Sequence, residues 1–281
     1  MERKILLSAD TPCDIGNELK ERYQVSLYPL HIILEGRQYT DGLDISPDML
    51  YEAWYQRKAL PKTAAINPGE YADYFRSLVE QGYDVLHISL GSGLSSSCQN
   101  AKLAAEEFEG VHVIDSRNLS TGFGHLVCEA GERIRAGMPI EQIVQEVDAA
   151  DIAAALEKKR EKLDVSFVLD TLDYLVRGGR CSSLAHLSAN LLNLKPCITV
   201  QVSECGGMTV GKKYAGKLPR VLKKYVQDQL EGRNDLLLDR VFITHSGIDA
   251  AILEDIHTQV LALQPFREVF ITRASCTISA H

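Results

Sequence analysis

The sequence has no apolar run that reaches the roughly 18 residues needed to cross a bilayer. It also lacks the hydrophobic core of a signal peptide, because the N-terminus MERKILLSAD turns polar after three apolar residues. The 7 cysteines are scattered and include no Cys-x-x-Cys pair, a pattern that is typical of a reduced, cytoplasmic protein and gives no zinc spacing. We therefore expect no metal site, no resident cofactor and no integral membrane segment.

The sequence also lacks an excess of positive charge. It has 30 Lys and Arg residues against 38 Asp and Glu residues, so the formal net charge is -8 and the isoelectric point is about 5.5. This argues against nucleic acid or an anionic membrane surface as the main partner. A hydrophobic content of 45% over 281 residues is ordinary for a globular protein and predicts a sizeable core, in one large domain or two lobes.

Short apolar runs alternate with longer amphipathic ones, which predicts parallel strands joined by crossover helices and therefore an α/β fold. The predicted strands are 4–9, 83–90, 111–116, 165–170, 239–246 and 267–274. The predicted helices between them are 68–82, 98–110, 218–232 and 250–264. The charge-rich segment ALEKKREKLD around residues 155–164 predicts a boundary between an N-terminal lobe of about 1–160 and a C-terminal lobe of about 161–281.

The stretch LHISLGSGLSSSCQNAKLAAEEF, which begins at Leu86, predicts a strand, a glycine-serine turn and a helix. The N–H groups of a first helical turn lack internal partners, so such a place attracts an anion or a capping oxygen. Gly91, Gly93 and Ser96 have the spacing of G-x-G-x-x-G with serine in place of the last glycine. Asp115 follows where a ribose-binding acid would stand, so the turn is compatible with a dinucleotide site as well as with simple turn chemistry.

A nucleophilic role for Ser95 is a second alternative. The G-x-S-x-G elbow is absent, because Ser97 occupies the place of its final glycine. The histidines that could supply a base in space are His31, His87, His125, His245 and His281. The sequence pairs none of them with a serine. The third alternative is that Ser95 or a neighbour caps the helix.

Two further segments carry candidate binding residues. Thr63 stands in the polar, proline-punctuated LPKTAAINPGE, just before a predicted helix, where a threonine is usually solvated or makes a local turn bond. Arg180 follows Gly178 and Gly179, a pair typical of a helix C-cap. An arginine there is either ordinary surface or a fork that grips a carboxylate, a phosphate or an acidic partner.

Together these motifs resemble the DegV family of bacterial fatty-acid-binding proteins, whose kinase-partnered members are called FakB. The resemblance covers nearly the whole chain, and the motifs occur in the family's order. They are SADTPCDI, YTDGLDIS, LPKTAAINPGE, GSGLSSSCQNA, VIDSRNLSTGFG, LDYLVRGGRCSS, LLNLKP and ISAH.

The resemblance implies a single DegV-like domain over residues 1–281, made of two α/β lobes with a mainly parallel sheet in the N-terminal lobe and the ligand between the lobes. It also implies that Thr63 and Ser95 hold the carboxylate of a fatty acid. The family's arginine after the double glycine falls on Arg180, and its C-terminal motif histidine falls on His281. These two are expected to contribute to the headgroup site or to partner contact.

The function implied is that of a lipid carrier with no catalytic residues of its own. It would bind one long-chain fatty acid and present the carboxylate to a fatty-acid kinase. The alternative from the residues themselves is an enzyme, either a serine hydrolase or a nucleotide-dependent protein that uses the turn 91–97.

Two departures from the family pattern stand out. The glycine, threonine and tyrosine that follow the family's motif serine are Ser96, Ser97 and Cys98 here, so headgroup geometry and acyl preference are expected to differ. Family members also continue with a glycine-containing tail, whereas this sequence stops at His281.

Overall fold

The computed structural model describes residues 3–147, 163–171, 175, 179 and 194–281. The chain forms two compact units that are not contiguous in sequence. The first unit combines residues 1–164 with two later segments, 201–207 and 274–280. The second unit combines residues 165–200 and 208–273 with the final residue, His281. Each unit is described by itself below.

A parallel sheet forms the centre of the first unit. In the described residues its strand order is β2-β1-β6-β7, and every neighbouring pair is parallel. The strands are β1 (Lys4–Asp10), β2 (Ser26–Tyr28), β6 (Tyr83–Ser89) and β7 (Val111–Asp115). β6 reads as a nearly continuous buried run, as expected for a strand that helices cover on both faces.

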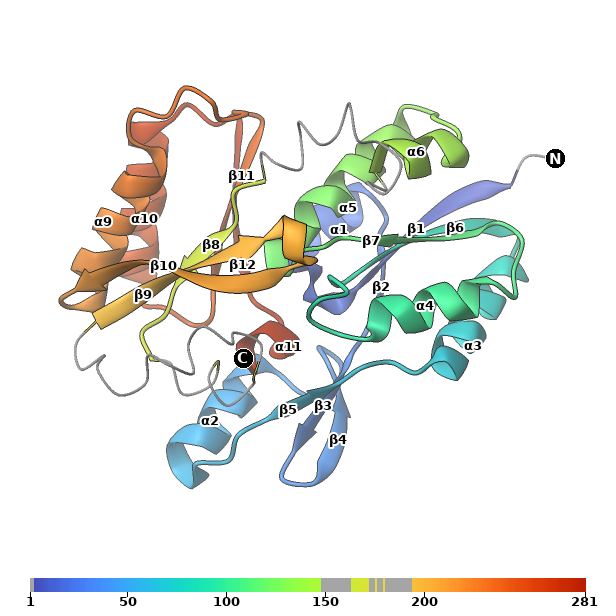
Figure 1. Ribbon diagram of the computed structural model, residues 1–281, viewed down its shortest axis with the longest axis horizontal. Helices are drawn as coiled ribbons and strands as arrows, with labels where there is room; N and C mark the ends of the chain where they lie inside the picture. Colours follow the sequence, from blue (N-terminus) through green and yellow to red (C-terminus); the bar gives the residue numbers. More distant parts are fainter. Residues whose placement is uncertain (1–2, 148–162, 172–174, 176–178, 180–193) are drawn as a thin grey trace. The chain divides into compact units, whose positions relative to one another are not determined.

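Helices lie on both faces of this sheet (Figure 1). On one face lie α3 (Pro68–Val79) and α4 (Ser97–Ala105); on the other lie α5 (Ser120–Arg135) and α6 (Ile140–Val147). A short 3-10 turn, η1 (Thr11–Cys13), and α1 (Gly16–Arg22) connect β1 to β2. The carboxyl ends of the parallel strands open at one edge, which is where ligands bind in open α/β sheets.

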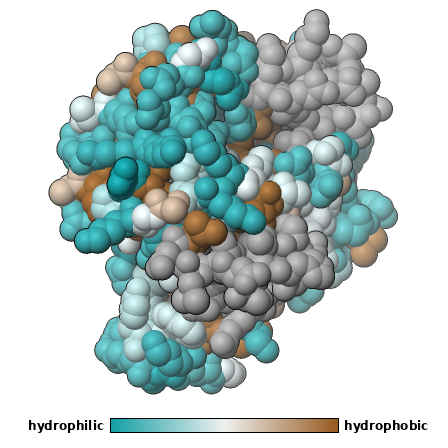
Figure 2. Space-filling model, turned by 60° about the vertical axis from the view of Figure 1, so that its left-hand side comes forward, coloured by the Kyte–Doolittle hydropathy of each residue, from teal (hydrophilic) through white to brown (hydrophobic). Residues whose placement is uncertain are grey.

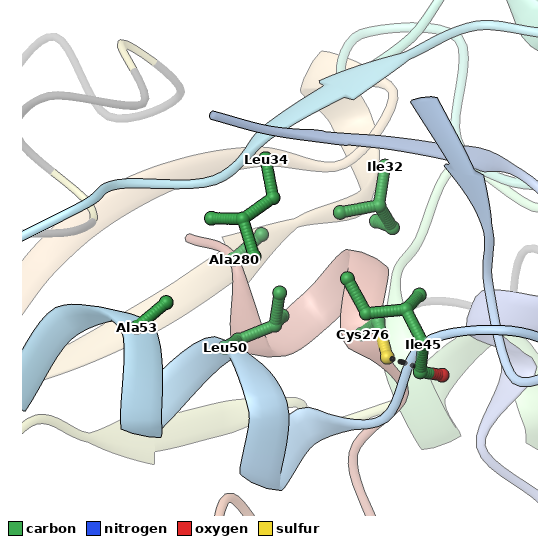
Figure 3. Close-up of a cluster of buried hydrophobic side chains, with 7 residues drawn as sticks. All are labelled: Ile32, Leu34, Ile45, Leu50, Ala53, Cys276 and Ala280. Atoms are coloured by element: carbon green, nitrogen blue, oxygen red, sulfur yellow. Dashed lines mark hydrogen bonds between the residues drawn. The ribbon is translucent and has the colours of Figure 1, made fainter. Parts of the chain in front are cut away.

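A smaller antiparallel sheet completes the first unit. Its order is β4-β3-β5, with β3 (His31–Leu34), β4 (Arg37–Thr40) and β5 (Lys62–Ala64). Between β4 and β5 runs α2 (Pro47–Arg57), and the last helix of the chain, α11 (Cys276–Ser279), packs against it. Figure 3 shows the resulting core, in which Cys276 and Ala280 meet Ile32, Leu34, Ile45, Leu50 and Ala53.

Two buried carboxylates bind the segment 274–280 to the rest of the first unit. Asp41 accepts hydrogen bonds from the N–H groups of Cys276 and Thr277, each at 3.0 Å, and from the Thr277 hydroxyl at 2.5 Å. Asp14 accepts the Ser275 N–H at 2.8 Å and the Ser120 hydroxyl at 2.6 Å. Burial raises the pKa of Asp14 from its ordinary 3.8 to about 7, and these two donors only partly oppose the shift.

The second unit contains two sheets in its described part. β8 (Ser166–Val168) pairs antiparallel with β9 (Leu194–Gln201), whose other neighbour is β10 (Gly207–Ala215), while β11 (Arg240–His245) and β12 (Glu268–Arg273) pair in parallel. α9 (Leu218–Leu230) and α10 (Ala250–Leu263) pack on each other around Val226, Ile256 and Val260. A short 3-10 turn, η3 (Val202–Glu204), joins β9 to β10 and belongs to the first unit.

The surface is mostly hydrophilic on the face drawn in Figure 2, where hydrophobic residues lie in small separate patches. None of the helices in the described ranges combines the length and apolar character that a membrane span requires. The α/β class and the parallel sheet in the N-terminal part are confirmed. Thr63, expected in a loop, instead lies in β5, because this segment pairs with the distant strand β3.

The raised pKa of Asp14 predicts a specific pH dependence of stability. Between pH 4 and about pH 7 the folded state holds a proton that the unfolded state has released, so this residue makes the free energy of unfolding fall as pH rises. Asp14→Asn removes the titration while its amide still serves both neighbours, as acceptor for the Ser275 N–H and donor to Ser120. We expect the variant to gain stability over the wild type from pH 5 to about 7, by on the order of 1 kcal/mol per pH unit, and to gain no more above that pH.

Urea unfolding at several pH values measures this, with the fluorescence of the single tryptophan, Trp54, as the signal. Asp44→Asn, at an exposed carboxylate in the same unit, is the control for the loss of one negative charge and should not reproduce the gain of Asp14→Asn. A wild type and an Asp14→Asn variant whose stabilities run parallel from pH 5 to 8 would contradict the assignment.

Candidate functional site

The two residues expected to hold a carboxylate both lie in the first unit. Thr63 is the middle residue of β5 and pairs with Ile32 of β3. Ser95 lies in the turn between β6 and α4, two residues before the helix begins. Both side chains are half-buried, so neither is sealed in the core.

Helix α4 contacts the segment that follows Thr63. The Asn100 side-chain amide donates to the carbonyl of Ile66 at 2.7 Å, which fixes the end of this segment against α4. One residue further on, Asn67 begins α3 with a capping box: its side chain accepts the Glu70 N–H, and the Glu70 carboxylate accepts the Asn67 N–H. The segment that carries Thr63 is therefore held both by α4 and by the start of α3.

The glycines of the 91–97 turn are explained by close backbone contact. A Cβ atom on Gly91 would stand 2.7 Å from the carbonyl oxygen of Cys205, and one on Gly93 would stand 2.7 Å from that of Glu204. The Gly93 N–H donates to Cys205 at 3.0 Å, and the Gly91 N–H donates to Asn118 at 2.9 Å. Only glycine allows the segment 201–207 to approach this closely.

Carboxylates that end β1 and β7, the two strands on either side of β6, hold the turn in place. Asp115, at the end of β7, accepts the Ser92 N–H at 3.1 Å, the Ser92 hydroxyl at 2.5 Å and the Arg117 N–H at 2.9 Å. Asp10, at the end of β1, accepts the Leu90 N–H at 2.9 Å and the Ser89 hydroxyl at 2.7 Å. Asp115 thus serves the turn itself, which weakens the dinucleotide interpretation of these glycines.

Asp10 has further polar partners in the core. It also accepts the Tyr71 hydroxyl at 2.7 Å, and the His87 imidazole lies 3.2 Å from it, with all three side chains buried. Burial acts to raise the pKa of Asp10, but the interactions with His87, Ser89 and Tyr71 outweigh burial and hold this pKa below its ordinary value. The carboxylate therefore remains charged at neutral pH.

Ser95 lies just before Ser96, the N-cap residue of helix α4, and satisfies one N–H group at the start of the helix. Its hydroxyl oxygen accepts the N–H of Ser97, the first residue of the helix, at 3.2 Å, and the two serine hydroxyl oxygens lie 3.0 Å apart. Among the described residues no histidine is hydrogen-bonded to Ser95, so the site shows none of the base contact that a serine nucleophile needs. The half-buried hydroxyl is suited to donate to an anion at the helix N-terminus.

The other two expected residues are not placed in this site. Arg180 lies outside the described residues; the preceding Gly179 has a φ of 68°, the conformation that a helix C-cap glycine adopts. His281 follows α11 at the end of the chain, is half-buried and belongs to the second unit. No group of His, Cys, Asp and Glu side chains in the described part of the chain could hold a metal ion.

Sequence reasoning missed the residues that support the turn. Tyr71 lies outside the motifs, and Asp10, although it stands in SADTPCDI at the end of a predicted buried strand, was given no role there, where a carboxylate needs several donors. That position was the available signal. Nothing in the sequence near residues 201–207 indicated that this segment packs against the turn 91–97.

The fold and the turn define an α/β protein whose candidate anion site lies where the parallel strands end. A family model described as "Uncharacterised protein, DegV family" matches residues 4–281. The chain therefore belongs to the DegV family. A DegV domain-containing protein of Deinococcus radiodurans is 33% identical over 226 residues, which cover 79% of this chain and 77% of the relative.

Solved structures agree with this membership. A Thermus thermophilus DegV family protein, described by its fatty acid binding, is 28% identical and superposes with a TM-score of 0.81 over 99% of this chain and 95% of its own. A fatty acid binding DegV family protein of Streptococcus agalactiae is 25% identical, with a TM-score of 0.82 over 100% of this chain and 95% of its own.

The backbone approach at Gly93 predicts that even a methyl group is not tolerated there. Gly93→Ala places Cβ within 2.8 Å of two carbonyl oxygens, of Glu204 and Cys205, and should lower the free energy of unfolding by about 1–3 kcal/mol. In the control Gly69→Ala, Cβ meets only the side-chain oxygen of Asn67, at 3.3 Å, and stability should change by less than about 0.5 kcal/mol. Equal effects of the two substitutions in urea unfolding would argue against this packing.

Proposed function

We propose that this protein binds one long-chain fatty acid and holds its carboxylate with the hydroxyls of Thr63 and Ser95. The observation that carries the proposal is the whole-chain similarity to the Thermus thermophilus DegV protein, for which fatty acid binding is described. The position of Ser95 supports it, because a half-buried hydroxyl at a helix N-terminus suits an anionic headgroup.

Neutral donors are adequate for such a headgroup. A hydroxyl that donates to a carboxylate makes a charge-assisted hydrogen bond, and the N-terminus of α4 adds a favourable dipole without a buried counter-charge. A carboxylate held by a lysine or arginine would be released less readily. Two hydroxyls therefore fit a protein that must also give up its ligand.

Most of the affinity would come from the acyl chain. Each buried methylene contributes roughly 0.8 kcal/mol, so a chain of roughly sixteen carbons supplies ample binding energy. The ordering of the chain and the loss of its mobility offset part of this gain. Headgroup contacts would then decide orientation and selectivity for a free acid more than total affinity.

The same proposal assigns the protein the role of a non-catalytic carrier. Its partner would be a fatty-acid kinase that phosphorylates the presented carboxylate, and Arg180 and His281 would contribute to the headgroup site or to contact with that partner. Support comes from the family's motif positions in this sequence. The absence of a base beside Ser95, within the part of the chain that the structure describes, favours the carrier over a serine hydrolase.

The carrier function predicts that lipid remains with the purified protein. Mass spectrometry of an organic extract, quantified against protein concentration, should find near-stoichiometric long-chain fatty acid. In Thr63→Ala/Ser95→Ala the affinity for hexadecanoic acid, measured after delipidation and reloading, should fall by on the order of 100-fold, because two charge-assisted hydrogen bonds are lost.

The matched control is Ser96→Ala, which removes an exposed hydroxyl from the same turn and should bind like the wild type. Folding of each variant is checked by its urea midpoint. A delipidated wild type that takes up no fatty acid would defeat the proposal and move the interpretation to the enzyme class, where a serine-directed covalent probe should label Ser95.

The kinase partnership is tested separately. Loaded with hexadecanoic acid and mixed with a bacterial fatty-acid kinase and ATP, the protein should yield acyl phosphate, trapped with hydroxylamine as the hydroxamate. Neither protein should do so alone. If a DegV relative gives product with the same kinase and this loaded protein gives none, the fatty-acid carrier function stands, but the partner of this protein is not that kinase.

A further inference from the structure

Segment 201–207 holds the backbone that leads into Ser95. The N–H of Gly93, two residues before Ser95, donates to the carbonyl of Cys205 at 3.0 Å. The carbonyl of Glu204 packs against the same glycine, because a Cβ atom on Gly93 would stand 2.7 Å from its oxygen. The course of the turn from Gly93 to Ser95 therefore depends on where segment 201–207 lies.

Leu94, the residue directly before Ser95, contacts the same segment. A Cβ atom on Gly206 would stand 3.2 Å from Cδ1 of Leu94 and 3.4 Å from the backbone carbonyl of Arg117. Gly206 is therefore packed closely against the Leu94 side chain. Both residues that precede Ser95 are in contact with this segment, one through a hydrogen bond and one through packing.

Two consecutive residues of this segment have left-handed backbone conformations. Cys205 has a φ of 53° and Gly206 has a φ of 95°, and the Gly206 N–H donates to the carbonyl of Gln201 at 3.1 Å. Glycine adopts such a conformation freely, whereas cysteine does so at a cost in free energy. Strain of this kind persists where the surrounding structure requires it, and it is concentrated at functional sites. Here the strained residue supplies the carbonyl that accepts the Gly93 N–H.

Thr63 is supported by other parts of the chain. It pairs with Ile32 of β3, and Asn100 of α4 fixes the end of its segment. Segment 201–207, in contrast, connects β9 to β10, and both strands lie in the second unit for most of their length. The two hydroxyls proposed to hold the ligand carboxylate therefore depend on different elements.

We propose that Cys205 is a positioning residue, whose left-handed backbone conformation fixes the turn that directs the Ser95 hydroxyl at a ligand carboxylate. This inference rests on the proposed function. The connection between β9 and β10 then controls one of the two donors, while Thr63 supplies the other independently. A change in the conformation of this connection alters ligand affinity by way of Ser95 alone.

Two substitutions at the same position test the backbone conformation. Valine strongly disfavours the left-handed region because its side chain is β-branched, whereas asparagine adopts that region more readily than most residues. Cys205→Val should raise the dissociation constant for hexadecanoic acid by roughly 3- to 10-fold, because Ser95 no longer donates well to the carboxylate. Cys205→Asn should stay within about 2-fold of the wild type. Both variants lose the thiol, so the difference between them reports on the backbone.

The matched control is Gln24→Val. Gln24 is exposed and also has a φ of 53°, but it lies between α1 and β2, at the edge where the parallel strands begin. This variant introduces the same backbone strain away from the turn and should bind with wild-type affinity. Affinities are measured by displacement of a fluorescent fatty acid from the delipidated full-length protein, and each variant's urea midpoint shows that it is folded. If Cys205→Val does not fold, Gly206→Ala tests the same point, because its Cβ atom would press on Leu94.

Double variants show whether the effect passes through Ser95. In a Ser95→Ala background, Cys205→Val should cause no further loss of affinity, because the hydroxyl that the turn positions is gone. In a Thr63→Ala background, Cys205→Val should cause its full loss, since Thr63 is supported elsewhere. A general distortion of the site would weaken binding in both backgrounds.

Hydrogen exchange tests the structural part of the inference without a ligand. In the delipidated protein, amides of the turn 91–97 should exchange faster in Cys205→Val than in the wild type, because the Gly93 N–H loses a well-placed acceptor. Exchange of this turn in Gln24→Val should match the wild type. Mass spectrometry of peptides that cover the turn measures both.

The outcomes are distinct. Weaker binding in Cys205→Val that is absent in Cys205→Asn and disappears without Ser95, together with faster exchange of the turn 91–97, supports the inference. Unchanged affinity, equal losses in the two variants, unchanged exchange, or a loss that persists in the Ser95→Ala background overturns it. If the wild type binds no fatty acid, the proposed function fails, and the exchange of the turn alone then decides whether Cys205 positions it.

Discussion

One buried negative charge organises the edge of the first unit at which the parallel strands end. Asp10 ends β1 with no exposure to water, and it is tolerable there only because Tyr71, Ser89 and the Leu90 N–H donate to it and His87 lies beside it. These groups come from β6 and from α3. Any movement of either element would leave the charge short of partners, so the end of β6, the turn after it and helix α3 keep a single arrangement.

That arrangement explains how a site made of neutral groups can be specific. Thr63 and Ser95 come from segments more than thirty residues apart in sequence. The first is held by pairing with β3 and by the contact of Asn100 with Ile66; the second is held by the turn that Asp10 and Asp115 fasten. Charged residues do the positioning from inside the protein, while the proposed site offers only hydroxyl groups to a ligand. The carboxylate of a ligand would thus meet donors without a salt bridge that resists release.

The sequence predicted the elements whose patterns are local. The strands at 4–9, 83–90 and 111–116 and the helices at 68–82 and 98–110 correspond to β1, β6, β7, α3 and α4, with ends that differ by a few residues. The hairpin β3–β4 and the strand β5 have no comparable periodicity, and Thr63 was placed in a loop. The partners of Asp10 lie 61 to 80 positions away, and those of Asp41 lie up to 236 away, so nothing within a short window could reveal them. The family motifs indicated Ser95 and Thr63 but not the buried residues behind them.

The discontinuity of the first unit has a consequence for biosynthesis. In the described part of the chain, its central sheet and the helices on it lie within residues 3–147, yet α11, which closes the core shared by β3 and α2, lies in the distant segment 274–280. On a ribosome, this core and the hydrogen bonds of Asp41 to Cys276 and Thr277 must wait until residues 274–280 have been made. The nascent unit would expose Ile32, Leu34 and Leu50 until then, and long-range closures of this kind fold slowly and leave a window for aggregation. The docking of segment 274–280 is thus also the step that buries the remaining apolar surface of this core.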